Sequence, residues 1–492
     1  MKTVTARQMH EIESAEFDLH HFSDDVFISA AARQLKERIN ELPQGKVLFL
    51  CGNNRNGDCG LLAASLLLRD SDRKIKAAVS ENDSVYHEHA AGQNLEILRV
   101  QRLIRQAVSD ADIIVDCIYG YDLDEEVSYP YSYWIEWVNA ARAYVVSLDV
   151  PSGLNSDNGS VMGSCVKADE TLAIQLPKIG CYLYPGSSLC GDLKIEDIGI
   201  SSEAISETET DCNITTYEEM KAALPSRFKH SHKGTYGKVL LIAGSSGKSG
   251  ACLLSARALM KSGAGLLTVM SERDVTDVVK NNLFEAMTLT VNEGNIESSL
   301  NGINFKDYTL IVMGPGLGRS LQTEIVLKKV LGSDLPVVID ADGLYYLKNN
   351  LEMVRNRKAL TVITPHIVEY QRIFEYRENA VIDDLRRISL EYPNLITVLK
   401  SEHTIIAHDG KICINVTGNN ALAKGGSGDV LCGVIGGLFA QRNDVSAVEA
   451  AVYVHSLAAD RWCDVHSSYS LLASDLIEMI DSVLFEMTRG KK

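Results

Sequence analysis

The sequence lacks the features that place a protein in a membrane, outside the cell or on a nucleic acid. No apolar run among its 492 residues approaches the length of a membrane-spanning helix. The charged segment 1–18 has no apolar core of the kind found in signal peptides. Positive charge is scarce, since 48 Lys and Arg residues stand against 65 Asp and Glu residues. This balance argues against nucleic acid or an anionic membrane as partner. We expect a cytoplasmic protein that acts on small molecules.

Paired cysteine motifs are also missing. The 11 cysteines form no CxxC pair and no zinc-ligand spacing, and most lie in apolar segments. Such cysteines are typical of buried thiols in a reducing compartment. A chain of 492 residues is too long for one hydrophobic core, so we expect at least two domains.

The order of apolar runs predicts an α/β fold with largely parallel sheets, because strand-like runs alternate with glycine turns and helical segments. The polar, acidic segment 201–220 is the best candidate for a linker. We therefore predict one domain over residues 1–215 and a second over residues 216–492. Candidate strands lie within 46–52, 111–120, 143–153, 170–176, 192–200, 237–246, 265–272, 308–318, 336–344, 359–366 and 394–410.

The segment 415–429, NVTGNNALAKGGSGD, carries the strongest chemical signal. Four glycines precede an acid and an apolar helix-like run. Backbone N–H groups at a helix start attract anions, whereas a carboxylate repels them. We interpret Gly425 to Gly428 as a phosphate cradle and Asp429 as a base, or as a group that orients a hydroxyl. The alternative is a glycine turn capped by an acid.

Further small-residue loops and charged groups follow the strands of the second half. They are GSSGKSG after residue 243, GPGLG at 314–318, Asp340 and Asp342 in DADGL, His366 with Glu369 in TPHxxE, and Lys400. Each alone fits an ordinary structural role: the two aspartates, for example, either bind a metal or cap a helix. In α/β sheets, however, sites form at the carboxyl ends of strands, where all of these groups occur.

The order of these motifs resembles the ADP-dependent NAD(P)H-hydrate dehydratase family over roughly residues 225–490. The resemblance implies a ribokinase-like fold and dehydration of the S-form of hydrated NADH and NADPH through phosphorylation at C6. It implies ADP, with ATP as the alternative, and Mg²⁺. The hydrate would contact Ala251, Gly316, His366 and Asp429. The adenine nucleotide would contact Lys400, Ser401, Glu402, His403, Thr404 and Gly428. Ser401 replaces the glycine usual in the family.

A small-molecule kinase of the ribokinase class is the alternative function, with a non-catalytic N-terminal nucleotide-binding module. The anion loop and the base would serve both reactions. The GPGLG and TPHxxE motifs and the preceding domain favour the dehydratase. Fused enzymes of this kind often form oligomers, so the sequence leaves open whether this chain forms a homo-oligomer.

Residues 1–215 resemble the NAD(P)H-hydrate epimerase domain of bifunctional members, which implies a Rossmann-like three-layer αβα fold. DVPSG at 149–153, VDCIYG at 115–120 and Lys178 carry the resemblance. It implies that Asp149 is catalytic, and that Asn56, Asp116 and Ser152 bind K⁺. The hydrate would contact Asn54, Arg55, Asn56, Gly57, Asp58, Gly120, Tyr121, Asp122 and Asp149.

The catalytic loop of this domain departs from the family pattern. GNNRNGDCG at 52–60 stands where the family has GxGNNGGDG, Tyr121 and Asp122 replace small residues, and the LMExAG helix is altered at 26–31. Non-glycine residues where a positive φ is required would strain the loop. We expect Arg55 to place a cation near the K⁺ site, and Tyr121 and Asp122 to crowd a phosphate-bearing ligand. These changes predict weakened or lost epimerase activity, whereas the retained Asp116, Asp149 and Ser152 favour activity.

Overall fold

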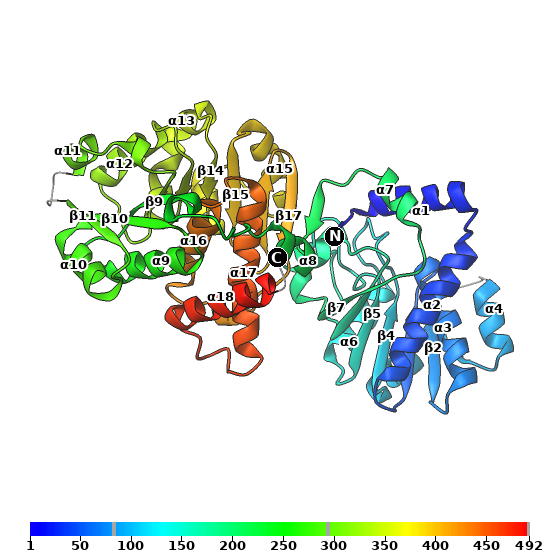
Figure 1. The fold of residues 1–492 in the computed structure, drawn as a ribbon. Coiled ribbons are helices and arrows are strands. Elements are labelled where there is room, and N and C mark those ends of the chain that lie inside the picture. The colour runs from blue at the N-terminus through cyan, green and yellow to red at the C-terminus, as the bar shows by residue number, and fades with distance from the viewer. Residues whose placement is uncertain (81–84, 292–295, 490–492) are drawn as a thin grey trace. The chain divides into compact units, whose positions relative to one another are not determined.

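The computed structural model describes residues 1–80, 85–291 and 296–489. The chain divides into two compact units, Lys2–Cys212 and Asn213–Lys492, and Met1 belongs to the second (Figure 1). No helix in the described part of the chain combines the length and apolar character needed to cross a membrane.

The N-terminal unit contains a parallel seven-stranded sheet in the order β3-β2-β1-β4-β5-β6-β7. One hydrophobic cluster joins the sheet to α2 and α3, and another joins it to α5 and α6. Helices therefore cover both faces, which confirms the three-layer αβα fold. The strands are β1 (Val47–Cys51), β2 (Ile75–Val79), β3 (Glu96–Leu98), β4 (Ile113–Cys117), β5 (Tyr144–Leu148), β6 (Glu170–Ile174) and β7 (Asp192–Glu196). The helices are α1 (Ala6–His20), α2 (Asp24–Glu41), α3 (Arg55–Asp70), α4 (Val85–Gly92), α5 (Gln101–Asp110), α6 (Tyr131–Ala140) and α7 (Ser202–Glu207).

The C-terminal unit contains a ten-stranded sheet in the order β11-β10-β9-β12-β13-β14-β15-β16-β17-β8. Its strands are β8 (Cys212–Ile214), β9 (Lys238–Ile242), β10 (Leu266–Glu272), β11 (Met287–Val291), β12 (Leu310–Met313), β13 (Val337–Ile339), β14 (Thr361–Ile363), β15 (Leu395–Leu399), β16 (Thr404–His408) and β17 (Lys411–Asn415). Its helices are α8 (Tyr217–Ala223), α9 (Ser249–Lys261), α10 (Arg273–Asn282), α11 (Ile296–Asn301), α12 (Leu321–Leu331), α13 (Leu351–Asn356), α14 (Ile367–Ile373), α15 (Val381–Glu391), α16 (Ser427–Phe439), α17 (Val445–Cys463) and α18 (Ala473–Thr488).

The division between the two units, after Cys212, falls inside the predicted linker segment 201–220. Much of that segment is regular: it forms α7, β8 and the start of α8, and β8 joins the sheet beside β17. One expectation from the sequence was wrong in detail. The segment 394–410 is not one strand. It forms β15 and β16, an antiparallel pair joined by a turn at residues 400–403. The polar residues of this turn interrupt two apolar runs, which is a hairpin signal.

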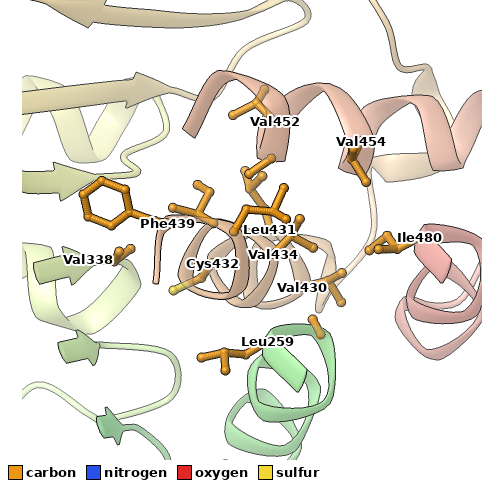
Figure 2. Packing of buried hydrophobic residues seen from close by; sticks show 14 of the residues in the cluster. Leu259, Val338, Val430, Leu431, Cys432, Val434, Phe439, Val452, Val454 and Ile480 are labelled. Atoms are coloured by element: carbon orange, nitrogen blue, oxygen red, sulfur yellow. The ribbon is translucent and has the colours of Figure 1, made fainter. Parts of the chain in front are cut away.

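Helix α16 is the centre of the C-terminal core. Its residues 430–439 are all buried, and they pack against α9, α17, α18 and β13 (Figure 2). A Cβ at Gly433 would lie 2.4 Å from the Ser255 carbonyl oxygen of α9, so only glycine permits this close helix packing. Ser255 also donates a hydrogen bond of 2.9 Å to the Asp429 carbonyl oxygen. These contacts fix the start of α16 relative to α9.

Candidate functional site

The predicted C-terminal site lies at the carboxyl ends of five neighbouring parallel strands, β9, β12, β13, β14 and β15. In the order β9-β12-β13-β14-β15, the strands are followed by the loops at 243–248, 314–318, 340–342, 364–366 and 400–403. The sheet therefore brings together motifs that are far apart in sequence.

The start of α16 presents backbone donors to this edge. Gly426, the residue before the helix, has φ = 97°, a conformation that favours glycine. The N–H groups of Gly428 and Asp429 have no acceptor in the part of the chain that the structure describes. The positive end of the helix dipole adds to these donors, so the local geometry suits an anion.

The carboxyl of Asp429 lies in the first turn of α16. Burial and neighbouring charges, not hydrogen bonds, determine its ionisation. Within the described ranges its carboxylate accepts no hydrogen bond. Burial raises its pKa to about 6, the negative charges of Asp340 and Asp342 act in the same direction, and Lys400 opposes them. An unpartnered carboxyl with a pKa near neutrality is suited to proton transfer.

Lys400 is anchored beside the start of α16 by a buried acid. Its Nζ donates to Asp340 Oδ1 at 2.9 Å, and Thr364 Oγ1 donates to the same oxygen at 2.6 Å. Burial disfavours the ammonium, but the attraction of Asp340 outweighs it and the pKa of Lys400 is raised. A Cβ at Gly428 would lie 3.7 Å from Lys400 Nζ. The cation thus lies next to the predicted phosphate cradle.

Asp342 holds the second glycine loop. Its Oδ2 accepts hydrogen bonds from the Gly318 N–H (2.9 Å) and Lys248 Nζ (3.0 Å), and its Oδ1 accepts one from Arg319 Nε (3.1 Å). Burial opposes the charge of Asp342, but these donors prevail and its pKa is lowered. The GPGLG loop is therefore tied to the strand that also carries Asp340.

The residues predicted to contact the hydrate lie along the same edge. A Cβ at Gly316 would lie 3.0 Å from Ala251 Cβ, so these two residues adjoin each other. His366 forms an isolated β-bridge with Lys400, and its side chain is 52% exposed. It caps α14 together with Glu369: the Glu369 N–H donates to His366 Nδ1, and the His366 N–H donates to Glu369 Oε2. Its capping role leaves much of the imidazole accessible.

All six residues predicted to contact the adenine nucleotide line one cavity of about 490 Å³. This volume lies within the range of about 300–1,000 Å³ that is usual for small-molecule sites. The cavity is lined by the turn at 400–403 with Thr404, by the loop at 417–423, and by the start of α16 and residues of α17. Ser401 Oγ donates to the His403 carbonyl oxygen, so the residue that departs from the family pattern stabilises the turn.

Two residues that position this cavity were missed by the sequence interpretation. Asp460 of α17 accepts hydrogen bonds from the Gly418 N–H and from Asn419 Nδ2, both at 2.8 Å. His455, also on α17, lines the cavity and its Nε2 lies 3.0 Å from the Ser427 carbonyl oxygen. Burial lowers the pKa of His455 to about 4, so the imidazole is neutral. Both lie on α17, a largely buried helix, and no motif marks either residue in the sequence.

The acids of the site suit Mg²⁺ held jointly with a nucleotide. No group of three or more His, Cys, Asp or Glu residues in the described ranges is arranged to hold a metal by itself. Asp429 nevertheless has a free carboxylate close to Asp340 and Asp342. Mg²⁺ typically uses one or two carboxylates together with substrate phosphates. The donor set fits that mode of binding.

The N-terminal unit also gathers predicted residues, at the carboxyl ends of β1, β4 and β5. One pocket is lined by Asn54, Arg55, Asn56, Gly120, Tyr121, Asp122 and Asp149 from the prediction. Gly57 and Asp58 do not line it, because they lie in the first turn of α3. A Cβ at Gly57 would lie 1.9 Å from the Gly52 carbonyl oxygen, so its role in the turn is close backbone packing.

The expected strain in the altered loop is absent. Asn54 has φ = −158° and caps α3, its side chain accepting a hydrogen bond from the Gly57 N–H at 2.9 Å. Arg55 and Asp58 are helical. None of these residues has a positive φ. The residues that replace glycine therefore do not have to adopt a left-handed backbone conformation. The strain expectation was wrong because the loop ends earlier and the helix starts at Arg55.

Asp116 and Ser152, two of the predicted K⁺ ligands, contact each other directly. Ser152 Oγ donates to Asp116 Oδ1 at 2.6 Å, and the Ser152 N–H donates to Oδ2 at 2.8 Å. Ser147 Oγ also donates to Oδ2, and the Ile118 N–H donates to Oδ1. Each carboxylate oxygen of Asp116 therefore accepts two hydrogen bonds. Burial raises the pKa of Asp116, against the effect of these donors. The third predicted ligand, Asn56, donates from Nδ2 to the Leu148 carbonyl oxygen at 3.3 Å.

Asp149 pairs with a fully buried lysine. Lys178 Nζ donates to Asp149 Oδ1 and to the Ile174 carbonyl oxygen, and its side chain is 0% exposed. Asp149 has φ = 69°, and its buried Oδ2 has no hydrogen-bond partner in the described part of the chain. A strained, half-satisfied carboxylate next to an ammonium is typical of functional sites. Lys178 was recognised in the sequence only as a matching position.

The fold and the site define a ribokinase-like nucleotide-dependent enzyme preceded by a Rossmann-like unit. Two family models match the chain. The model of NAD(P)H-hydrate dehydratase matches residues 239–482, and that of the YjeF-related protein N-terminus matches residues 27–180. The chain belongs to the family of bifunctional NAD(P)H-hydrate repair enzymes.

Similar proteins span nearly the whole chain. The bifunctional NAD(P)H-hydrate repair enzyme Nnr of Coxiella burnetii is 32% identical over 96% of this chain and 96% of its own length. The enzyme of the same name from Moorella thermoacetica is 31% identical over 98% of this chain and 97% of its own length. The structure of ADP/ATP-dependent NAD(P)H-hydrate dehydratase from Bacillus subtilis, co-crystallised with ATP and Mg²⁺, is 33% identical. It has a TM-score of 0.51 and covers 57% of this chain and 100% of that one.

Proposed function

We propose that the C-terminal unit dehydrates the S-form of hydrated NADH and NADPH at the expense of ADP, with ATP as the alternative donor. The observation that carries this proposal is the cavity of about 490 Å³ that joins the turn at 400–403 to the start of α16, with the carboxyl of Asp429 beside it. Its size suits a nucleotide. The family membership supports the identity of the substrate.

In the proposed reaction Asp429 removes the proton from the C6 hydroxyl of the hydrate while that oxygen attacks the terminal phosphoryl group. The N–H groups of Gly428 and Asp429 and the ammonium of Lys400 stabilise the charge on the transferred group. Mg²⁺ supplies further charge neutralisation when it is bound with the nucleotide. Loss of phosphate from C6 and of a proton from the neighbouring C5 then restores the reduced ring.

The N-terminal unit is proposed to interconvert the R- and S-forms of the hydrate, with Asp149 as the proton-transfer group. The unpartnered Asp149 Oδ2 and the adjoining Lys178 ammonium support this role. K⁺ bound by Asn56, Asp116 and Ser152 remains a prediction. It requires Ser152 Oγ to turn away from Asp116, because each carboxylate oxygen already accepts two hydrogen bonds.

The dehydratase proposal is tested by incubating the full chain with purified S-NADH hydrate, Mg²⁺ and ADP. Reduced-nicotinamide absorbance should return in step with AMP and phosphate, and it should not return without nucleotide. A phosphorylated product that accumulates without absorbance would establish the small-molecule kinase instead. The cytoplasmic location, the absence of nucleic-acid partners and a homo-oligomeric state remain predictions from the sequence.

A further inference from the structure

The N-terminal pocket is too small for the ligand that its residues are proposed to bind. Its free volume is about 50 Å³, although its walls include Asn56, Gly120 and Asp149. Pockets for small-molecule ligands usually enclose about 300–1,000 Å³. A whole nicotinamide nucleotide therefore does not fit inside this pocket as its side chains now stand.

Three side chains that line the pocket are joined in a network around Arg55. Arg55 Nη2 donates to Glu13 Oε1 at 2.8 Å and to the Tyr121 hydroxyl at 2.7 Å, and Arg55 Nη1 lies 2.7 Å from Glu13 Oε2. The Tyr121 hydroxyl donates to Glu13 Oε2 at 2.9 Å. The Glu13 side chain is 10% exposed and that of Arg55 28%. The guanidinium is thus paired with a carboxylate at both of its outer nitrogens.

The two charges come from different helices that line the pocket. Glu13 lies on α1, whereas Arg55 is the first residue of α3 and stands where the resemblance predicts an asparagine. Acidic side chains outnumber the one guanidinium around this pair. Asp24 of α2 lies 3.5 Å from Arg55, and His10 of α1 lies 2.7 Å from Asp122. Arg55 is therefore a cation that this chain adds to the pocket and neutralises mainly with Glu13.

We propose that Arg55 binds the phosphate of the nicotinamide nucleotide and that Glu13 occupies its guanidinium while the pocket is empty. A guanidinium holds phosphate and carboxylate in the same two-pronged geometry, so one anion replaces the other without leaving the cation unpaired. Release of Glu13 frees α1 from Arg55 and makes room in the pocket. The assignment rests on the proposed epimerase function of this unit.

Removal of the charge of Glu13 should strengthen substrate binding, because the substrate no longer competes with a carboxylate of the chain. Glu13→Gln keeps the shape of the side chain. Tyr121→Phe removes the hydroxyl that links both charges, without altering either. Arg55→Gln removes the proposed phosphate contact. Glu11→Gln is the matched control, since Glu11 lies on the same helix, is half-exposed and pairs only with Arg7 among the described residues.

The experiment follows conversion of R-NADH hydrate to the S-form by the full chain, with the two forms separated by chromatography and no ADP present. Glu13→Gln should lower the KM for the R-form by about tenfold and Tyr121→Phe by a smaller factor, with little change in kcat. Arg55→Gln should raise the KM by at least about tenfold. Glu11→Gln should behave as the unmodified chain.

Equal KM values for Glu13→Gln and Glu11→Gln would overturn the assignment, as would an unchanged KM for Arg55→Gln. So would a complete absence of R-to-S conversion in every variant, because the epimerase function on which the assignment rests would then fail. ADP-dependent turnover of the S-form is measured separately on the same preparations. If the unmodified chain shows no such turnover, the dehydratase proposal fails, whereas the result for the R-form is unaffected.

Discussion

The ammonium of Lys400 lies 2.9 Å from the carboxylate of Asp340, and this pair adjoins the carboxyl of Asp429. The two charges act on Asp429 in opposite directions: Asp340 raises its pKa and Lys400 lowers it. Thr364 Oγ1 fixes Asp340, and Asp340 in turn fixes Lys400. The charge state of the proposed base is therefore set by residues from three strand ends.

Replacement of the proposed base should abolish most turnover while the protein stays folded. For Asp429→Asn we expect kcat for the S-hydrate to fall by about 10²–10⁴, the usual contribution of a positioned general base. Thermal stability should not fall, because the carboxylate is partly buried without a hydrogen-bond partner. Activity measurements and thermal melts on the same preparation check both parts. An active Asp429→Asn variant would exclude the assigned role.

The pH dependence should report the same group. Because burial raises the pKa of Asp429 to about 6, the base is protonated below that pH and ionised above it. We expect kcat/KM for the hydrate to be low on the acid side, to rise through about pH 6 and then to level off. A kcat/KM that stays constant between about pH 5 and about pH 8 would contradict the assignment of Asp429 as the base.

The neighbouring charges should move this acidic limb in opposite directions. Asp340→Asn removes a negative charge and should shift the limb to lower pH. Lys400→Met removes a positive charge and should shift it to higher pH, as well as raise the KM for ADP. The comparison of the two limbs separates an electrostatic effect from a general loss of structure, since misfolding would not shift them apart.

A methyl group in the phosphate cradle should obstruct the nucleotide without disturbing the fold. The Cβ of Gly428→Ala would lie 3.7 Å from Lys400 Nζ, which is an ordinary contact within the chain. The same methyl group would project into the cavity that Gly428 lines. We expect a KM for ADP about tenfold higher, or more, and an unchanged melting temperature. Gly302→Ala, which does not line this cavity, is the control and should leave both quantities unchanged.

Buried His455 should make the fold sensitive to acid. Its pKa is about 4 in the folded chain, below the ordinary value of 6.5, so the unfolded chain binds the proton first. Stability from this residue is fully present above pH 6.5 and is lost as the pH falls toward 4. The loss amounts to about 3 kcal/mol. Denaturant melts of His455→Gln should show a weaker pH dependence across this window. An identical slope in both proteins would contradict the assignment.

The sequence predicted those parts of the fold that depend on local pattern. Buried apolar runs such as Val239–Ile242 and Ile113–Val115 became central strands, since parallel strands covered on both faces are apolar throughout. The short strand Cys212–Ile214 was missed because its polar surroundings resemble a linker. It pairs with β17, which lies beyond the last candidate strand in the sequence.

The residues of the C-terminal site could be listed from the sequence, but their interactions could not. Asp340 and Lys400 are both strand-end residues, yet their contact spans 60 positions and depends on the order β13-β14-β15. In the N-terminal unit the motif comparison identified Arg55 as unusual. Its partner Glu13 lies in a helix without a motif, so the contact between the two is visible only in three dimensions.

The most direct measurement of the central claim is the stoichiometry of turnover on purified S-NADH hydrate with ADP and Mg²⁺. The full chain and its Asp429→Asn variant are followed in parallel for reduced nicotinamide, AMP and phosphate. We expect the unmodified chain to form all three in equal amounts and the variant to form almost none. Formation of a stable phosphorylated hydrate, or return of reduced nicotinamide without consumption of ADP, would contradict nucleotide-driven dehydration by this site.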